Sequence, residues 1–235
     1  MGAGANERVA MVSGANRGIG LAIARALAAR GFRLSLGVRK PGVAIAGLAS
    51  DRVFVAPYEA RDAAAGDAWV AATMARFGRI DVLVNNAGIA PQVHLETGTD
   101  SDLDALLDIN VKAPFRLLRA AFPHLRVSGS GRIINVASLS GKRVLGPNAG
   151  YQMAKHAVIA LNHAARRAGW DHGIRSTALC PGFVNTDLVA QHPDLDMKQL
   201  TQPEDLALLA CTLIDLPNNA AVAELLVNWR HETMM

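Results

Sequence analysis

The amino-acid sequence predicts an α/β fold, in which a doubly wound parallel sheet of about seven strands forms one domain. Short apolar segments alternate with longer segments of helical periodicity along the chain. This alternation is typical of parallel strands that helices cover on both faces. No internal repeat, linker or change of composition divides the chain, so we expect residues 1–235 to form a single domain.

The first half of the chain alternates strands and helices as such a fold requires. The periodic segment after a glycine-rich turn ends at Gly31, which is a helix stop signal. Asp62 can cap the next helix, and the segment 41–50 is so short that a helix there would be reduced. We expect strands at 9–12, 34–38, 53–55 and 81–84, and helices at 19–30 and 62–77.

The second half continues the alternation. Gly169 would end one helix, and Thr201 and Glu204 form a capping-box pattern around Pro203 that predicts the start of the last helix. We expect helices at 103–125 and 151–168, a last helix that the capping box at 201–204 opens and that runs to about 216, and strands at 132–136, 174–180 and 223–227. The irregular stretches 88–100, 138–149 and 183–200 each follow a strand. Because ligands bind at the carboxyl ends of parallel strands, we expect these stretches to form the walls of a site.

The composition excludes several classes of protein. Hydrophobic residues make up 51% of the chain and charged residues 19%, which excludes a disordered protein. The net charge of +4 is scattered, and aromatic residues are only 5%, so we expect no nucleic-acid partner. No apolar run approaches the length that spans a bilayer, so we expect no association with a membrane.

The cysteines and the N-terminal residues indicate the cellular compartment of the protein. Cys180 and Cys211 lack metal-binding spacing, and no other His, Cys or acidic group shows it, so we expect no metal. Two free thiols in a reducing compartment are a simpler interpretation than a disulfide. Residues 1–7 do not have the pattern of a secretory signal. We therefore expect a cytoplasmic protein.

A glycine-rich turn follows the first predicted strand and has the spacing Gly-x-x-x-Gly-x-Gly. Glycine permits a tight turn and a close approach of the backbone to a pyrophosphate, which the free N–H groups of the following helix attract. The turn lacks the Gly-Lys-Ser/Thr ending of a P-loop, which disfavours a nucleoside triphosphatase. The expected dinucleotide contacts are Gly14, Asn16, Arg17, Gly18, Ile19 and Gly20.

The end of the second predicted strand bears on the choice of cofactor. An acidic residue there would bind the 2′-hydroxyl of NAD, and a basic one would suit the 2′-phosphate of NADP. Arg39 and Lys40 stand at this point without a carboxylate, and Arg17 is expected nearby. These cations favour NADP(H), with NAD possible. The alternative interpretation is that Arg39 and Lys40 belong to a solvated loop.

Tyr151 and Lys155 lie one helical turn apart on one predicted helix, so their side chains share a face. A tyrosine hydroxyl with its reference pKa of ~10 is a poor acid or base at neutral pH. A neighbouring ammonium would stabilise the phenolate and lower the pKa of Tyr151. Ser138 ends the fifth predicted strand and can meet Tyr151 across the intervening loop. The group can then move a proton to or from a carbonyl or alcohol oxygen.

Together these motifs resemble the signature set of the short-chain dehydrogenase/reductase family. The matching residues are the glycine turn, Asn85-Asn86-Ala87-Gly88, Asn110, Ser138, Tyr151, Lys155 and Pro181-Gly182, and the resemblance covers residues 8–227. It implies a single Rossmann-type domain with a seven-stranded parallel sheet. It also implies NAD(P)-dependent hydride transfer between an alcohol and a carbonyl compound.

The resemblance implies a role for each matching residue. Tyr151 would be the general acid/base, Lys155 would lower its pKa and bind the nicotinamide ribose, and Ser138 would hydrogen-bond the reacting oxygen. Asn110 would hold a water molecule that joins Lys155 to solvent; an ordinary mid-helix Asn is the alternative interpretation. The implied cofactor contacts beyond the glycine turn are Asn86, Ala87, Gly88, Pro181, Gly182, Val184 and Thr186, besides Tyr151 and Lys155.

The chain departs from the family pattern in two places. An Asp that contacts adenine usually follows the third strand; here we assign that contact to Glu59, while Asp62 is the alternative or only a helix cap. Asn228-Trp229-Arg230 stands where Asp-Gly-Gly is common, which leaves the C-terminal contacts open. The resemblance further implies a homodimer or homotetramer, in which the helices at 103–125 and 151–168 form the interface.

The choice of substrate would fall to the strand-end loops. Their candidate wall residues are Val93, His94, Leu139, Val144, Leu145, Phe183, Leu188, Val189 and His192. Because this set contains no cluster of Arg or Lys, it favours a small or medium-sized uncharged carbonyl or alcohol substrate. The alternative function is a cofactor-binding regulatory protein with little activity. The complete set of Ser138, Tyr151 and Lys155 argues against that alternative.

Overall fold

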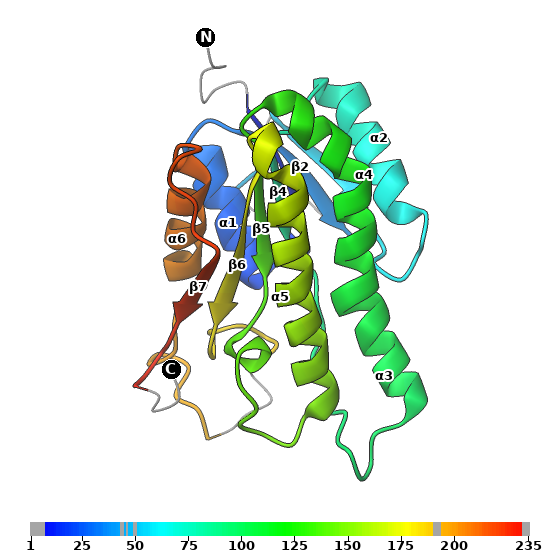
Figure 1. Cartoon of the computed structure of the whole chain (residues 1–235), viewed down its shortest axis with the longest axis vertical. Helices are drawn as coiled ribbons and strands as arrows, with labels where there is room; N and C mark the ends of the chain where they lie inside the picture. The colour runs from blue at the N-terminus through cyan, green and yellow to red at the C-terminus, as the bar shows by residue number, and fades with distance from the viewer. Residues whose placement is uncertain (1–7, 43–44, 46, 49–50, 190–193, 232–235) are drawn as a thin grey trace.

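The computed structural model describes residues 8–42, 45, 47–48, 51–189 and 194–231. Seven parallel strands form one sheet in the order β3-β2-β1-β4-β5-β6-β7 (Figure 1). The strands are β1 (Val9–Ser13), β2 (Arg33–Val38), β3 (Val53–Pro57), β4 (Val82–Asn85), β5 (Arg132–Val136), β6 (Arg175–Pro181) and β7 (Glu224–Val227). The sheet confirms the predicted fold class. The strand order reverses between β1 and β4, where such folds bind ligands.

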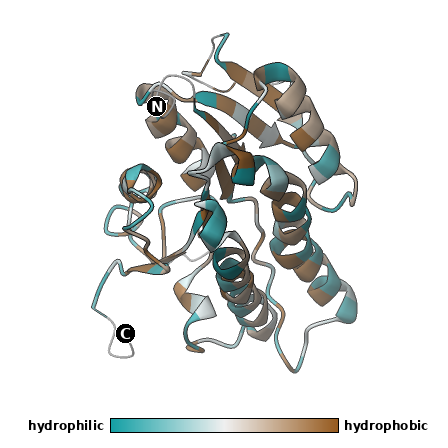
Figure 2. Ribbon diagram, turned by 45° about the horizontal axis from the view of Figure 1, so that its top comes forward, coloured by the Kyte–Doolittle hydropathy of each residue, from teal (hydrophilic) through white to brown (hydrophobic). Residues whose placement is uncertain are grey.

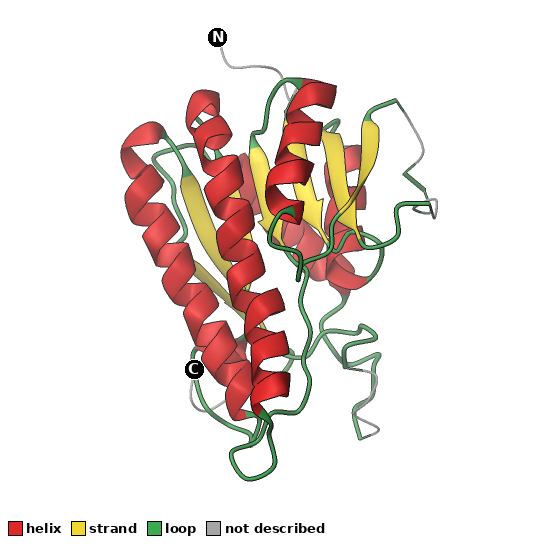
Figure 3. Cartoon of the chain, turned by 90° about the vertical axis from the view of Figure 1, so that its right-hand side faces the viewer, coloured by secondary structure: helices red, strands yellow, loops and turns green. Residues whose placement is uncertain are grey.

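Helices cover both faces of the sheet (Figure 3). The helices are α1 (Gly18–Ala29), α2 (Ala65–Phe77), α3 (Asp100–Leu107), α4 (Ala113–Ser128), α5 (Ala149–Gly169) and α6 (Pro203–Asp215). α1 and α6 pack together in one apolar cluster, whereas α2, α4 and part of α5 share the cluster on the other face. Figure 2 shows hydrophobic residues in the strands and hydrophilic ones on outward helix faces. Among the described residues, no helix is long and apolar enough to cross a membrane.

The helix predicted at 103–125 is longer and less regular than expected. It begins at Asp100, because the Thr99 hydroxyl caps the helix and accepts a hydrogen bond from the Asp102 backbone N–H at 3.1 Å. A π-helical turn, η2 (Asp108–Lys112), separates α3 from α4. Asn110 lies within this turn, and such turns often occur at functional sites.

Two predicted helix starts differ from the structure. The capping box of α6 uses Gln202 and Asp205 rather than Thr201 and Glu204, because Pro203 takes the first helical position and makes the preceding residue the cap. Asp62 accepts a hydrogen bond from the Ala64 N–H at 2.9 Å, but α2 begins only at Ala65. Among the described residues between β2 and β3 there is no helix, which agrees with the reduced segment that we expected.

Asp81 joins three elements at the amino end of the sheet, far from the strand ends that carry the site. Its carboxylate accepts hydrogen bonds from the Val9 N–H at 2.8 Å, from Ser128 at 2.7 Å and from Arg79 at 2.7 Å. Burial alone would raise the pKa of Asp81, but these hydrogen bonds outweigh burial and hold the pKa below its ordinary value.

Asp81→Asn is expected to lower the free energy of unfolding at neutral pH by roughly 2–3 kcal/mol, because hydrogen bonds to a charged carboxylate are lost. A carboxyl whose pKa is lowered in the folded state stabilises the fold above its unfolded pKa, and this contribution disappears as the pH falls through the folded pKa. Chemical denaturation across acidic pH should therefore show the two proteins converging. A constant difference at every pH would contradict the role of the charge.

Candidate active site

A cavity of about 1160 Å³ lies at the carboxyl ends of the strands and brings most of the predicted site residues together. The predicted residues that line it are Gly14, Asn16, Arg17, Gly18, Ile19, Arg39, Glu59, Asn86, Ala87, Gly88, Ser138, Tyr151, Lys155, Pro181, Gly182, Val184 and Thr186. Gly20 and Asn110 do not line the cavity. Both lie behind its wall, and each makes close backbone contacts described below.

The glycine turn forms one end of the cavity. Gly14 and Gly18 have φ angles of 65° and 53°, a left-handed conformation that favours glycine. A Cβ at Gly20 would lie 2.4 Å from both the Gly14 carbonyl oxygen and Nδ2 of Asn86. The Asn86 amide donates hydrogen bonds to the carbonyls of Ser13 and Gly14, which ties β4 to the turn. This cradle at the N-terminus of α1 fits the pyrophosphate of a dinucleotide.

Ser13 is a structural residue of this turn that the sequence did not single out. Its hydroxyl accepts hydrogen bonds from the backbone N–H groups of Asn86 at 2.9 Å and Ala87 at 3.1 Å, and donates to Val84 at 3.3 Å. These contacts hold the segment after β4 against β1. A serine at the end of an apolar strand, directly before the glycine turn, is the signal that could have identified it.

Ser138, Tyr151 and Lys155 meet where β5 and α5 face the cavity. The Tyr151 hydroxyl shares a hydrogen bond with Ser138, and Nζ of Lys155 donates to the Val136 carbonyl at 3.0 Å. Asn148 fixes the start of α5, because its side-chain oxygen accepts hydrogen bonds from the N–H groups of Tyr151 and Val93. Asn148 is a positioning residue that the sequence analysis missed, although an Asn just before a helix is a typical cap.

The pKa of Tyr151 shifts in the direction opposite to the expectation. Burial raises this pKa to about 12, and the hydrogen bond from Ser138 offsets only part of the rise. Lys155 is also buried, and burial lowers the pKa of its amine to about 8. Its Nζ lies 5.6 Å from the centroid of the Tyr151 ring and bonds to a backbone carbonyl. The loss of hydration, which disfavours the charged form of each group, is therefore the main cause of both shifts.

Both polar groups of the Asn110 side chain form hydrogen bonds with the backbone of Ile89. Its oxygen accepts a hydrogen bond from the Ile89 N–H at 2.9 Å, and its amide donates to the Ile89 carbonyl at 2.8 Å. The side chain thus fastens the loop after β4 to the π-helical turn, which explains an Asn inside a helix. The predicted water held by Asn110 stays a prediction.

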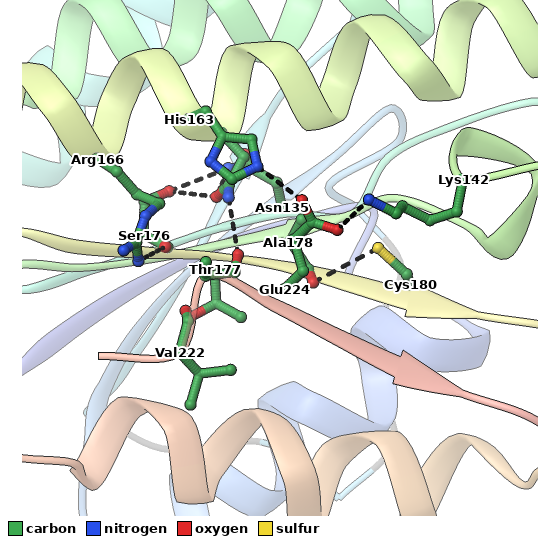
Figure 4. A network of polar contacts seen from close by, with 12 residues as sticks. Asn135, Lys142, His163, Arg166, Ser176, Thr177, Ala178, Cys180, Val222 and Glu224 are labelled. Atoms are coloured by element: carbon green, nitrogen blue, oxygen red, sulfur yellow. Dashed lines mark hydrogen bonds and ion pairs between the residues drawn. The ribbon is translucent and has the colours of Figure 1, made fainter. Parts of the chain in front are cut away.

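A polar network joins α5, β7 and the turn that follows Ser138 (Figure 4). Glu224 contacts Nζ of Lys142 at 2.6 Å and Nε2 of His163 at 2.7 Å. Lys142 follows the 3₁₀ turn η3 (Leu139–Gly141), and His163 lies on α5 beyond Tyr151. Further hydrogen bonds of this network join Asn135, Asn162 and Ser176. The network therefore fixes the turn that carries Ser138 relative to the helix that carries Tyr151.

The cations expected near the adenosine, Arg17 and Arg39, both line the cavity, but only Arg39 comes from the end of β2. Arg17 pairs with Asp187 at 3.0 Å, and both side chains are largely exposed. Arg39 is exposed and directly follows β2, so the end of this strand carries no carboxylate. Glu59 follows β3 and lines the same cavity, and Arg61 lines it as well.

The prediction of the residues that form the wall of the substrate site is partly confirmed. Leu139, Leu145, Phe183, Leu188 and Val189 line the cavity, whereas Val93, His94 and Val144 do not, and His192 lies outside the described residues. Val93 is buried in a separate apolar cluster under the loop. The residues that line the cavity without having been assigned to this wall from the sequence include Arg143, Trp229, Arg230 and His231. The last three follow β7, a strand end that the sequence analysis had not counted among the wall segments.

Comparisons with known proteins agree with this architecture. A family model described as short chain dehydrogenase matches residues 8–195. Agropine synthesis reductase from Rhizobium rhizogenes is 42% identical over 217 residues, which cover 91% of this chain and 50% of that protein. The chain therefore spans about half the length of this curated relative.

Two solved structures have the same fold over almost their whole length. The 3-ketoacyl-(acyl-carrier-protein) reductase from Brucella melitensis, complexed with NADH, is 27% identical with a TM-score of 0.88 and covers 96% of this chain and 98% of its own. The alcohol dehydrogenase from the archaeon Thermococcus sibiricus, complexed with 5-hydroxy-NADP, is 28% identical with a TM-score of 0.82 and covers 94% and 95%. Because the family model matches most of the chain, we conclude that the protein belongs to the short-chain dehydrogenase/reductase family of oxidoreductases.

Proposed function

We propose that the protein is an NADP(H)-dependent oxidoreductase that interconverts an alcohol and a carbonyl compound, with Tyr151 as the general acid/base. The observation that carries this proposal is the convergence of Ser138, Tyr151 and Lys155 in one cavity that continues to the glycine turn. The two neighbours complexed with NADH and with 5-hydroxy-NADP support a nicotinamide cofactor in the same cavity. A reduced nicotinamide, when bound, supplies the hydride.

Tyr151 suits the role of proton donor in carbonyl reduction. With a pKa of about 12, its hydroxyl keeps the proton at neutral pH and can deliver it to an oxygen that becomes negative. Ser138 hydrogen-bonds the same hydroxyl and can orient the reacting oxygen beside it. Lys155, whose pKa of about 8 leaves it largely protonated at neutral pH, would stabilise the phenolate formed on Tyr151.

The backbone turns of the cavity would hold the two ends of the cofactor. Gly14, Gly18 and the N-terminus of α1 suit the pyrophosphate, and Pro181, Gly182, Val184 and Thr186 suit the nicotinamide end. Asn86, Ala87 and Gly88 would lie along the adenosine ribose, and Glu59 would contact adenine. Asn110 would act through a water near Lys155.

The charges at the end of β2 support NADP(H) over NAD(H). Arg39 stands where a carboxylate would bind the ribose 2′-hydroxyl, and Arg17, which pairs with Asp187, lines the same cavity from the glycine turn. A guanidinium can donate two parallel hydrogen bonds to a phosphate, which suits the 2′-phosphate of NADP.

The test follows NADPH absorbance across a panel of aldehydes and ketones, with NADH in parallel, and titrates both cofactors by fluorescence. We expect turnover with NADPH and tighter binding of NADPH than of NADH. Arg39→Ala should weaken NADPH binding roughly 10-fold, because a charge-assisted hydrogen bond is lost, and leave NADH binding unchanged.

Lys40→Ala is the matched control, because Lys40 is an exposed neighbouring cation that does not line the cavity. This variant should bind both cofactors like the wild-type protein. Tighter binding of NADH, or an equal effect of Arg39→Ala on both cofactors, would refute the preference for NADP(H). A lack of turnover with every carbonyl compound and both cofactors would refute the proposed reaction.

The proposal also covers the oligomeric state and the cellular location of the protein. Phe115 on α4 and Met153 on α5 are apolar side chains that are 51% and 55% exposed, which supports a homodimer or homotetramer through these helices. Cys180 and Cys211 are free and buried, which supports a reducing compartment such as the cytoplasm.

A further inference from the structure

Two aromatic side chains from different strand ends meet in the part of the cavity that holds Ser138. β5, β6 and β7 lie side by side at one edge of the sheet, whereas β3 forms the opposite edge (Figure 1). Phe183 follows β6 and Trp229 follows β7, and both residues line the cavity. Their ring centroids are 6.3 Å apart, with planes tilted by 59°. The two rings therefore come from the side of the sheet away from β2 and β3, whose ends carry Arg39 and Glu59.

A backbone contact holds Trp229 next to the turn that carries Ser138. The Gly182 N–H donates a hydrogen bond to the Val227 carbonyl at 2.9 Å, which joins the segment after β7 to the turn after β6. A Cβ at Gly182 would lie 3.2 Å from both Leu139 Cδ1 and Trp229 Cδ1, so both side chains lie close to this glycine. Because Leu139 directly follows Ser138, the indole lies beside the residue proposed to orient the reacting oxygen.

The surface that these side chains present to the cavity is apolar. Leu139 is buried, Trp229 is partly buried, and Phe183 remains 38% exposed although it is a large apolar residue. The exposed guanidinium of Arg230 lies over the indole, with Cζ 4.6 Å from the ring centroid, and this cation–π contact supports the ring at the wall. Apolar side chains that are accessible in a concave site bind the apolar part of a ligand.

We propose that the substrate is a carbonyl compound that carries an apolar ring, and that Trp229 is the residue that selects it. The ring of the substrate would lie against Trp229 and Phe183 while its carbonyl oxygen meets Ser138 and Tyr151. Aromatic side chains provide a large apolar surface, and rings attract each other in offset or tilted arrangements. This inference rests on the proposed carbonyl reduction, and it narrows the small or medium-sized uncharged substrate that the sequence favoured.

The experiment compares carbonyl compounds that share their reacting group. Butanone and benzylacetone are methyl ketones that differ by one phenyl ring, and propanal and hydrocinnamaldehyde are the corresponding aldehydes. Levulinate, a methyl ketone with a carboxylate, tests whether charge decides instead. With NADPH or NADH, whichever the protein uses, the phenyl compound should exceed its partner in kcat/KM by roughly 10- to 100-fold, the effect expected when an apolar ring leaves water. Levulinate should react no faster than butanone.

Trp229→Ala should remove most of this preference. It should raise KM for the phenyl compound roughly 10-fold and leave kcat unchanged, because the wall binds substrate and transition state alike. The kinetics with the compound that lacks the ring, and the affinity for the cofactor, should stay at their wild-type values; an unchanged affinity for the cofactor also shows that the variant is folded. Trp229→Phe should keep most of the preference, since it retains an aromatic wall.

Trp170→Ala is the matched control. Trp170 is 45% exposed and also has a guanidinium over its ring, with Cζ of Arg175 3.8 Å from the centroid, but it does not line the cavity. This variant should show the wild-type preference for the phenyl compounds.

Three results would overturn the inference while the reaction stands. The first is an equal rate for the two compounds of each pair, or an equal effect of Trp229→Ala on both. The second is a loss of cofactor affinity in Trp229→Ala with an unchanged preference, which would place the indole on the cofactor. The third is faster reduction of levulinate than of benzylacetone, which would assign the selection to the cations of the cavity.

Equilibrium binding, measured by ligand-observed NMR, separates this inference from the proposed reaction. If no compound is reduced but benzylacetone binds more tightly than butanone, and Trp229→Ala removes the difference, the apolar site stands and the proposed reaction fails. Equal binding of benzylacetone and butanone without turnover of any compound overturns both.

Discussion

Replacing Tyr151 with Phe is expected to lower kcat for carbonyl reduction by about 10²- to 10⁴-fold, the usual contribution of a general acid. The phenol of Tyr151 is partly buried beside Ser138 and keeps its proton at neutral pH, and phenylalanine retains the ring but cannot donate a proton. NADPH affinity should therefore remain unchanged. Steady-state kinetics together with a fluorescence titration of NADPH measure both quantities in one preparation.

Tyr58→Phe is the matched control for this experiment. Tyr58 is the other tyrosine of the chain, and burial raises its pKa to about 12, as it does for Tyr151. Its ring packs on Trp69 with centroids 4.9 Å apart, at the end of β3 and away from Ser138. Tyr58→Phe should keep the wild-type kcat. A Tyr151→Phe protein that turns over at a comparable rate would rule out Tyr151 as the proton donor.

Gly20→Ala is expected to abolish binding of the dinucleotide and to lower the free energy of unfolding by about 1–3 kcal/mol, a typical cost of overpacking. The added Cβ would lie 2.4 Å from the Gly14 carbonyl oxygen, which is backbone and cannot rotate away. The turn is held in place, because the Gly14 N–H donates to the Gly37 carbonyl at 2.9 Å. Cofactor titration and chemical denaturation give the two results.

Gly66→Ala provides the comparison, because Gly66 also lies in the first turn of a helix. Its added Cβ would meet the Leu117 backbone at 3.6 Å, which is an ordinary contact. This change should leave cofactor binding intact and stabilise the protein by roughly 0.5–1 kcal/mol, since alanine favours the helix over glycine. If Gly20→Ala binds NADPH like the wild-type protein, the glycine turn is not the pyrophosphate cradle.

Much of this protein was predictable because its patterns are local. Apolar periodicity fixes strands and helices within a few residues, and β1, β5 and α5 agree with their predicted ranges to within two or three residues. The glycine turn and the Tyr151–Lys155 pair are likewise short-range patterns. The predicted helix boundaries were wrong where a neighbouring residue determines the start of the helix. Pro203 takes the first helical position of α6, so the cap lies one residue later than predicted.

The sequence alone determined the α/β fold, the family and many of the residues that meet at the strand ends, because spacing along a strand or helix determines which side chains share a face. The tertiary structure decided the rest. It raised the pKa of Tyr151, because desolvation depends on what surrounds the hydroxyl rather than on its neighbour one turn away. It also brought Trp229 and Arg230, which follow the last strand, to the same cavity as Ser138 and Tyr151, since contacts between distant segments depend on how the whole sheet packs.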